Sequence, residues 1–220
     1  MTPKAGVGTV GGRATTPPAT VTKVPGNRSR RPRGAANLRE QVDMTNATAP
    51  GETRTSSPHP FDAELAAQWL ALAHPSPRAA RGEWSSAAKL AVLPLGRTFD
   101  AVRIPEDVVH AAAQSDEPST TGSWLARHLS GPVIRDPGFR RYYVLVPPGT
   151  AQAWRARDTE CLGDGTYLGV PRTDRIEVDE RAPLAAYWSV PMARPGRLCQ
   201  AADVLELVLL GHVLTGGDEA

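Results

Sequence analysis

The sequence predicts an α+β domain: a mixed β-sheet with flanking helices, preceded by a disordered N-terminal tail. Three observations support this fold class. Residues 61–85 have the apolar spacing of helices, a series of short apolar runs follows between residues 89 and 191, and an amphipathic segment closes the chain at 199–214. Helices and strands that do not alternate strictly favour α+β over a parallel α/β sheet.

The N-terminal part of the chain is predicted to be a tail at residues 1–59, followed by one domain at 60–216. All twelve aromatic residues lie after residue 60. Residues 1–60 carry nine basic and three acidic side chains, a net charge of +6, whereas residues 61–220 carry 16 and 20, a net charge of −4. A segment without aromatic residues or apolar periodicity buries too little surface to fold. The basic run at 28–34 could bind nucleic acid phosphates, but we favour a solvated tail. Met44 in this tail is a possible alternative start.

Composition predicts a cytoplasmic protein without a membrane anchor. The chain has two cysteines and no C-x-x-C motif, so reduced thiols are expected. The first twenty residues lack an apolar segment of the secretory type, and the longest apolar run, 204–214, is too short to span a bilayer. Only three of the 25 basic residues are lysine, which is typical of GC-rich bacterial genomes. Abundant arginine is therefore weak evidence for nucleic-acid binding.

The first half of the domain is expected to contain three helices and two strands. Residues 60–74 and 76–84 read as helices, the second with Ser76 as N-cap and Pro77 in its first turn. The apolar run 90–95 predicts a buried strand, and residues 98–104 predict a second strand after a turn at Gly96. Pro105 should open a helix at 105–114, with acidic residues in its first turn.

The second half begins with a further short helix at 121–130 and is then mostly β. Strands are expected at 132–136 and 141–147, joined as a hairpin around 137–138, and at 166–170 and 186–190. The last of these should pair with a strand in the region 159–171. The closing helix should bury the stripe formed by Leu205, Val208, Leu209 and Val213, which lie three to four residues apart.

One carboxylate stands out in the strand at 98–104. Side chains alternate along a strand, so Phe99, Ala101 and Arg103 share one face, and Asp100, Val102 and Ile104 the other. A carboxylate among apolar neighbours needs a partner, a ligand or a place at the strand end. Other chemical motifs are missing from the sequence: we find no Walker loop, no H-E-x-x-H and no Cys/His zinc array.

The strand series "AVLPLG…FDAV…GFRRYYVLVP…ECLGDGTYLGVP…YWSVP" resembles the N-terminal domain of bifunctional DNA primase-polymerases, over residues 61–215. In that family a strand carries Asp-x-Asp or Asp-x-Glu, which holds divalent ions, and later strands supply a His and a third acid. On this resemblance Asp100 matches the first acid, but the second falls on Val102. The His position falls on Arg140 and the third acid on Glu160.

The resemblance therefore implies a degenerate catalytic site and no resident cofactor. Several arginines and tyrosines could line a phosphate-binding cleft with aromatic stacking: Arg135, Arg140, Arg141, Arg155, Arg157, Tyr142 and Tyr167. Equally, these arginines could pair with Asp136, Asp158 and Glu160 on an ordinary surface. We also expect Asp100 to pair with Arg140 inside the former cleft.

Three functions are compatible with these residues. The first is a non-catalytic or weakly catalytic primase-polymerase-like domain that binds DNA or a nucleotide, with a possible regulatory role. The second is an active nucleotidyltransferase that uses Asp100 and Glu160 with a Mg²⁺ ion. The third is a protein-interaction module without a small ligand, whose partner the sequence does not identify.

Overall fold

The structure of this chain, a computed structural model, describes residues 60–216 and confirms the α+β class. The predicted tail, its basic run and Met44 lie outside the described residues. Within 60–216 the elements are, in order, α1 (Pro60–Ala71), α2 (Pro77–Ser85), β1 (Leu90–Pro94), β2 (Asp100–Pro105), α3 (Glu106–Ala113), α4 (Pro118–His128), β3 (Val133–Asp136), β4 (Arg141–Val146), α5 (Thr150–Ala153), β5 (Glu160–Leu162), β6 (Tyr167–Pro171), β7 (Tyr187–Val190) and α6 (Ala201–Gly216).

The strands form two antiparallel sheets instead of the single mixed sheet that we predicted. One sheet has five strands in the order β5-β2-β4-β3-β7, and the other pairs β1 with β6. The predicted hairpin is confirmed, because β3 and β4 pair in antiparallel register. The expected partner of β7 is wrong: β7 pairs with β3. Local apolar runs locate strands well, but the choice of neighbour depends on packing across the whole domain.

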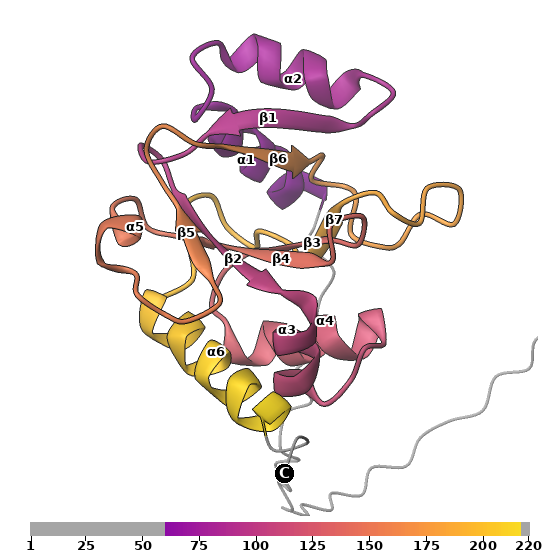
Figure 1. The fold of residues 1–220 in the computed structure, drawn as a ribbon. Coiled ribbons are helices and arrows are strands. Elements are labelled where there is room, and N and C mark those ends of the chain that lie inside the picture. The colour runs from indigo at the N-terminus through magenta and orange to yellow at the C-terminus, as the bar shows by residue number, and fades with distance from the viewer. Residues whose placement is uncertain (1–59, 217–220) are drawn as a thin grey trace, which may run out of the picture. The chain divides into compact units, whose positions relative to one another are not determined.

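The five-stranded sheet separates two hydrophobic cores. Figure 1 shows α1, α2 and the two-stranded sheet on one side of it, and α3, α4 and α6 on the other. Phe99 and Ala101 belong to the first core, whereas Val102 and Ile104 belong to the second. The alternation predicted from the sequence of β2 is thus confirmed, since successive side chains of a strand enter opposite faces.

The closing helix is present, but its predicted buried stripe is wrong except at Val208. The buried residues of α6 are Val204, Leu207, Val208 and Gly211. Leu209 and Val213 are instead among the exposed large apolar residues of the structure. Gly211 explains the orientation of the helix, because a Cβ atom there would lie 2.3 Å from the carbonyl oxygen of Val108 in α3. The two helix backbones approach closely at this glycine, and that contact sets which face is buried.

The helices of the described part are all short or interrupted by polar residues. None of those in residues 60–216 is long and apolar enough to cross a membrane.

Candidate functional site

Asp100 lies at the first position of β2, fully buried, and its partner is a backbone amide. Its side chain is 1% exposed. The Oδ2 atom accepts a hydrogen bond of 2.9 Å from the backbone N–H of Ala151, in the first turn of α5. The N-cap position of α5 is Gly149, which has no side chain to supply this acceptor. Asp100 therefore serves as the cap of α5 from a distant strand, and its negative charge suits a helix N-terminus.

The predicted ion pair between Asp100 and Arg140 is wrong. Arg140 lies in the turn before β4, and its carbonyl accepts a hydrogen bond from the N–H of Glu106, just after β2 ends. Asp100 occupies the opposite end of β2. Five residues of strand correspond to about 17 Å, which is too far for an ion pair. The resemblance gave the two positions but could not show at which end of the sheet each would lie.

Arg140 instead pairs with Glu106, which also faces a second arginine. The distance from Arg140 Nε to Glu106 Oε1 is 2.6 Å, and that from Arg135 Nη2 to Glu106 Oε2 is 3.7 Å. The side chains of Glu106 and Arg135 are only 14% and 12% exposed, whereas that of Arg140 is 77% exposed. Arg135 is thus a nearly buried cation whose charge Glu106 neutralises within the fold, so it is poorly placed to bind a phosphate.

Tyr142 also takes part in this buried network and cannot stack on a nucleobase in this conformation. It is fully buried in the second core, and the guanidinium of Arg135 lies 5.5 Å from the centre of its ring. Its hydroxyl lies 3.2 Å from Nε2 of His110, and burial followed by the charge of Arg135 lowers the pKa of that histidine. The network of Glu106, Arg135, Tyr142 and His110 holds α3 against the sheet.

Glu160 cannot share a metal ion with Asp100, because the two carboxylates point to opposite faces of the sheet. Glu160 stands directly opposite Arg103 in the pairing of β5 with β2, and the two side chains form an ion pair. Arg103 and Asp100 are three residues apart on one strand and therefore face opposite ways. Within residues 60–216 no group of three His, Cys, Asp or Glu side chains could hold a metal ion.

Arg155 and Arg157 lie together beside α6, at a groove of about 780 Å³. The groove is bounded by the segment 149–157 and by the first half of α6, and its apolar walls include Trp154, Leu205 and Leu209. Arg155 donates from Nη1 to the carbonyl of Trp154 at 2.6 Å and from Nη2 to that of Gln152 at 2.8 Å. Two of the predicted arginines and an aromatic side chain thus line one groove.

The other predicted binding residues lie apart from this groove. Tyr167 is exposed on β6, in the two-stranded sheet. Arg141 begins β4 and stands opposite Asp136 in the sheet. The predicted binding residues are therefore spread over four places: the α6 groove, the Glu106 network, the pairing of β3 with β4 at Arg141, and the two-stranded sheet.

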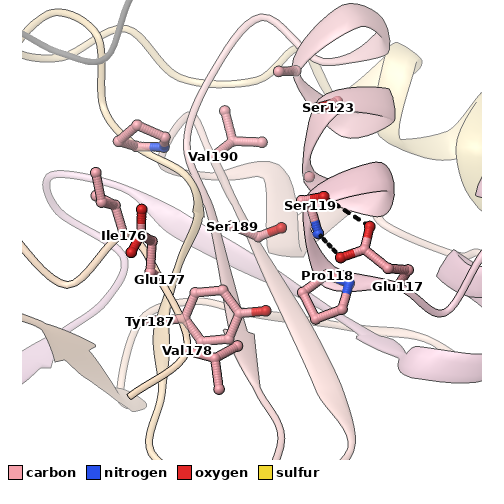
Figure 2. Close-up of a pocket in the computed structure, with 13 residues that line it drawn as sticks. Glu117, Pro118, Ser119, Ser123, Ile176, Glu177, Val178, Tyr187, Ser189 and Val190 are labelled. Carbon is pink, nitrogen blue, oxygen red and sulfur yellow. Dashed lines mark hydrogen bonds between the residues drawn. The ribbon is translucent and has the colours of Figure 1, made fainter. Parts of the chain in front are cut away.

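A further cavity, of about 460 Å³, lies between α4, β7 and the loop before β7. Figure 2 shows the ring of Tyr187 and the side chain of Ser189 between the helix that carries Ser119 and the loop that carries Glu177. Glu117 on its rim is fully engaged as the N-cap of α4. Neither Lys nor Arg lines this cavity among the described residues, so it does not suit a phosphate group.

Two residues that organise these sites, Glu106 and Trp154, were not predicted from the sequence. Glu106 reads as an ordinary acid in the first turn of a helix, and Trp154 as one more apolar residue between strands. Only the spacing Trp154-Arg155-x-Arg157, an aromatic residue among arginines, offered a signal. Comparison with known proteins found no matching family model, no matching curated protein and no matching solved structure.

Proposed function

We propose that this chain is a non-catalytic primase-polymerase-like domain that binds single-stranded nucleic acid or a nucleotide in the groove beside α6. The observation that carries the proposal is the meeting of Trp154, Arg155 and Arg157 at one apolar groove. Single-stranded nucleic acids are bound by aromatic or apolar surfaces for the bases and by cations for the backbone. The volume of the groove, about 780 Å³, lies in the usual range for small-ligand sites.

The two arginines have hydrogen-bonding capacity left for a phosphate. Arg155 uses two N–H donors on backbone carbonyls, and a guanidinium has five. Arg157 pairs with Asp158 at 3.1 Å, but both side chains are exposed. An exposed pair of this kind contributes little energy, so an incoming phosphate can compete for the arginine. Charge and shape at the groove therefore favour an anionic ligand with a flat apolar part.

The absence of catalysis is proposed from the placement of the carboxylates. Asp100 is engaged as the cap of α5, and Glu160 is paired with Arg103 on the other face. A two-metal polymerase site needs carboxylates that converge on ions about 4 Å apart. These two carboxylates do not converge, so we expect no nucleotide incorporation by the purified protein.

Fluorescence anisotropy with a labelled single-stranded oligonucleotide tests this proposal, with unlabelled mononucleotides as competitors. Arg155→Ala combined with Arg157→Ala should weaken binding at least tenfold, and binding should fall as salt rises. Arg78→Ala, which removes an exposed arginine of α2, is the matched control and should bind normally. Equal binding by all three proteins, or none by the wild type, would refute the groove. Mg²⁺-dependent primer extension lost in Asp100→Ala would restore the nucleotidyltransferase.

A second candidate function, a protein-interaction module, is favoured by the exposed apolar face of α6. Its exposed large residues are Leu205, Leu209, Leu210, Val213 and Leu214. Apolar patches of this kind mark interaction surfaces. Two measurements separate this alternative from nucleic-acid binding: binding to the partner would depend on Val213, which is exposed but does not line the α6 groove, and it would be insensitive to salt.

A further inference from the structure

Apart from the α6 groove and the cavity beside α4, the described residues form a cavity around Asp100. This cavity, of about 330 Å³, lies between the start of β2, α5 and the turn that joins β5 to β6. Its polar lining comes from Asp100, Gln152, Cys161, Asp164 and Thr166. Only Gly149 lines both this cavity and the α6 groove. A ligand of the Asp100 cavity therefore does not require nucleic-acid binding in the groove.

One oxygen of Asp100 has no hydrogen-bond partner among the described residues. Oδ2 is bound by the N–H of Ala151, but Oδ1 is buried and no hydrogen-bond donor reaches it from the described residues. Gly163 lies under the carboxylate, where a Cβ atom would be 3.5 Å from each oxygen and would overlap the side chain of Ala151 at 2.6 Å. A buried carboxylate oxygen without a donor is costly. A donor from outside the described residues would satisfy this oxygen.

The charged side chains that line the cavity determine whether a cationic or an anionic group fits there. Its two charged side chains, Asp100 and Asp164, are both acidic, and no Lys, Arg or His of residues 60–216 lines it. Thr166 Oγ1 already donates to the carbonyl of Gly163 at 2.6 Å, so its proton is not directed at Asp100. Two carboxylates that line one open cavity attract a cation and repel phosphate.

The number of available ligands and their protonation state indicate which type of cation fits the cavity. Mg²⁺ takes six oxygen ligands in near-octahedral geometry, usually several waters with one or two carboxylates, and no group of three His, Cys, Asp or Glu side chains among the described residues could hold a metal ion. Burial, followed by the nearby charge of Asp100, raises the pKa of Cys161 to about 12, so its thiol stays neutral and is a poor metal ligand. An ammonium group needs only a few acceptors at hydrogen-bond distance, and this cavity supplies them.

We propose that the Asp100 cavity binds the primary ammonium group of a small aliphatic amine, which donates to Oδ1 of Asp100 and is held at the rim by Asp164. The ammonium can belong to a free amine or to a lysine side chain presented by another protein. In both cases the same contacts complete the buried carboxylate.

Isothermal titration calorimetry on the full chain tests the proposal with putrescine and with 1,4-butanediol, its uncharged analogue. Putrescine should bind at least tenfold more tightly than the diol. N-acetyl-lysine amide is a second ammonium probe, and whichever of the two amines binds more tightly identifies the source of the group. Equal binding of putrescine and the diol, or no binding of either amine, would overturn the proposal. So would Mg²⁺ binding that depends on Asp100 and that putrescine does not compete with.

Two substitutions locate the site. In Asp100→Asn the side-chain oxygen can still accept from Ala151, while the charge is lost, so putrescine binding should weaken at least tenfold. Asp164→Asn, on the exposed rim, should weaken it severalfold without affecting folding, and remains informative if the first variant does not fold. Asp116→Asn, an exposed acid that does not line the cavity, is the control and should bind as the wild type does. Wild-type affinity in both cavity variants would contradict the assignment.

Discussion

Neutralising Glu106 should lower the free energy of unfolding strongly, although it changes the shape of one side chain very little. Glu106→Gln keeps the size of the side chain but leaves Arg135, only 12% exposed, without an opposite charge. Breaking a buried ion pair by removing one partner costs about 3–5 kcal/mol. The ring of Tyr142 lies 5.5 Å from the guanidinium of Arg135, and the hydroxyl of Tyr187 is 3.4 Å from Nη1. Because these contacts remain, we expect a loss of about 3 kcal/mol, the lower end of that range.

Two matched variants separate the buried pair from weaker effects. Arg140→Gln removes the closer partner of Glu106, but that side chain is 77% exposed, so the cost should be below about 1 kcal/mol. Asp107→Asn removes a neighbouring, exposed acid from the same helical turn and reports the helix-dipole contribution alone, about 0.3–1 kcal/mol. Arg135→Met combined with Glu106→Gln removes both buried charges and should recover part of the loss.

Urea unfolding followed by circular dichroism measures these differences. The expected order of stability is wild type, then Arg140→Gln and Asp107→Asn close together, then Glu106→Gln well below them. A domain of this size is stabilised by only about 5–15 kcal/mol, so the last variant should have a clearly lower midpoint. If Glu106→Gln costs no more than the two controls, Arg135 is adequately solvated without its partner and the reasoning from burial is refuted.

Three further predictions concern helix packing, the exposed face of α6 and a helix cap. Gly211→Ala should destabilise the domain by about 1–3 kcal/mol, because the new Cβ would lie 2.3 Å from the carbonyl oxygen of Val108. Gly82→Ala is the control and should be neutral or stabilising, because its Cβ would have no atom within 4 Å. Thermal unfolding of both variants tests this. Leu209→Asp should change stability by less than about 1 kcal/mol, because Leu209 is 55% exposed, and a larger loss in urea unfolding would show that this face is covered. Hydrogen bonds from Thr120 and then Ser119 lower the pKa of Glu117 to about 2, so Glu117 should stabilise the fold above pH 4.5 and lose this effect as the pH falls from 4.5 towards 2. In Glu117→Gln the melting temperature should therefore vary less with pH over this range than in the wild type. An equal pH dependence in the two proteins would argue against the cap.

The resemblance to primase-polymerases indicated which residues match the catalytic positions of that family, but it could not show how these residues are arranged in space. It placed Asp100, Arg140 and Glu160 in one cleft, as the catalytic chemistry of that family would require. In the fold, each has its own partner: Ala151, Glu106 and Arg103. The sequence shows which residues belong to a strand. Which residues of other strands they contact, and at which end and on which face of the sheet, depends on strand register and strand order. Two pairs of predicted arginines did come together, Arg155 with Arg157 and Arg135 with Arg140, and the members of each pair are close in sequence.

The sequence by itself determined the features that depend on neighbouring residues. Proline at the start and periodic apolar residues placed α2, and alternation assigned Phe99 and Val102 to different cores, as the structure confirms. Capping, periodicity and alternation act within a few residues, so they can be read without knowing the rest of the fold.

Only the tertiary structure decided which surfaces those elements present to one another. Large apolar residues of α6 lie on both its buried and its exposed faces, so the apolar stripe expected from the sequence could not show that Gly211, not Leu209, faces α3. The partner of Asp100 lies 51 residues away in the chain, in a helix of four residues that no periodicity announces. Such contacts are fixed by the simultaneous packing of several elements, which involves distances and steric limits that a linear sequence does not contain.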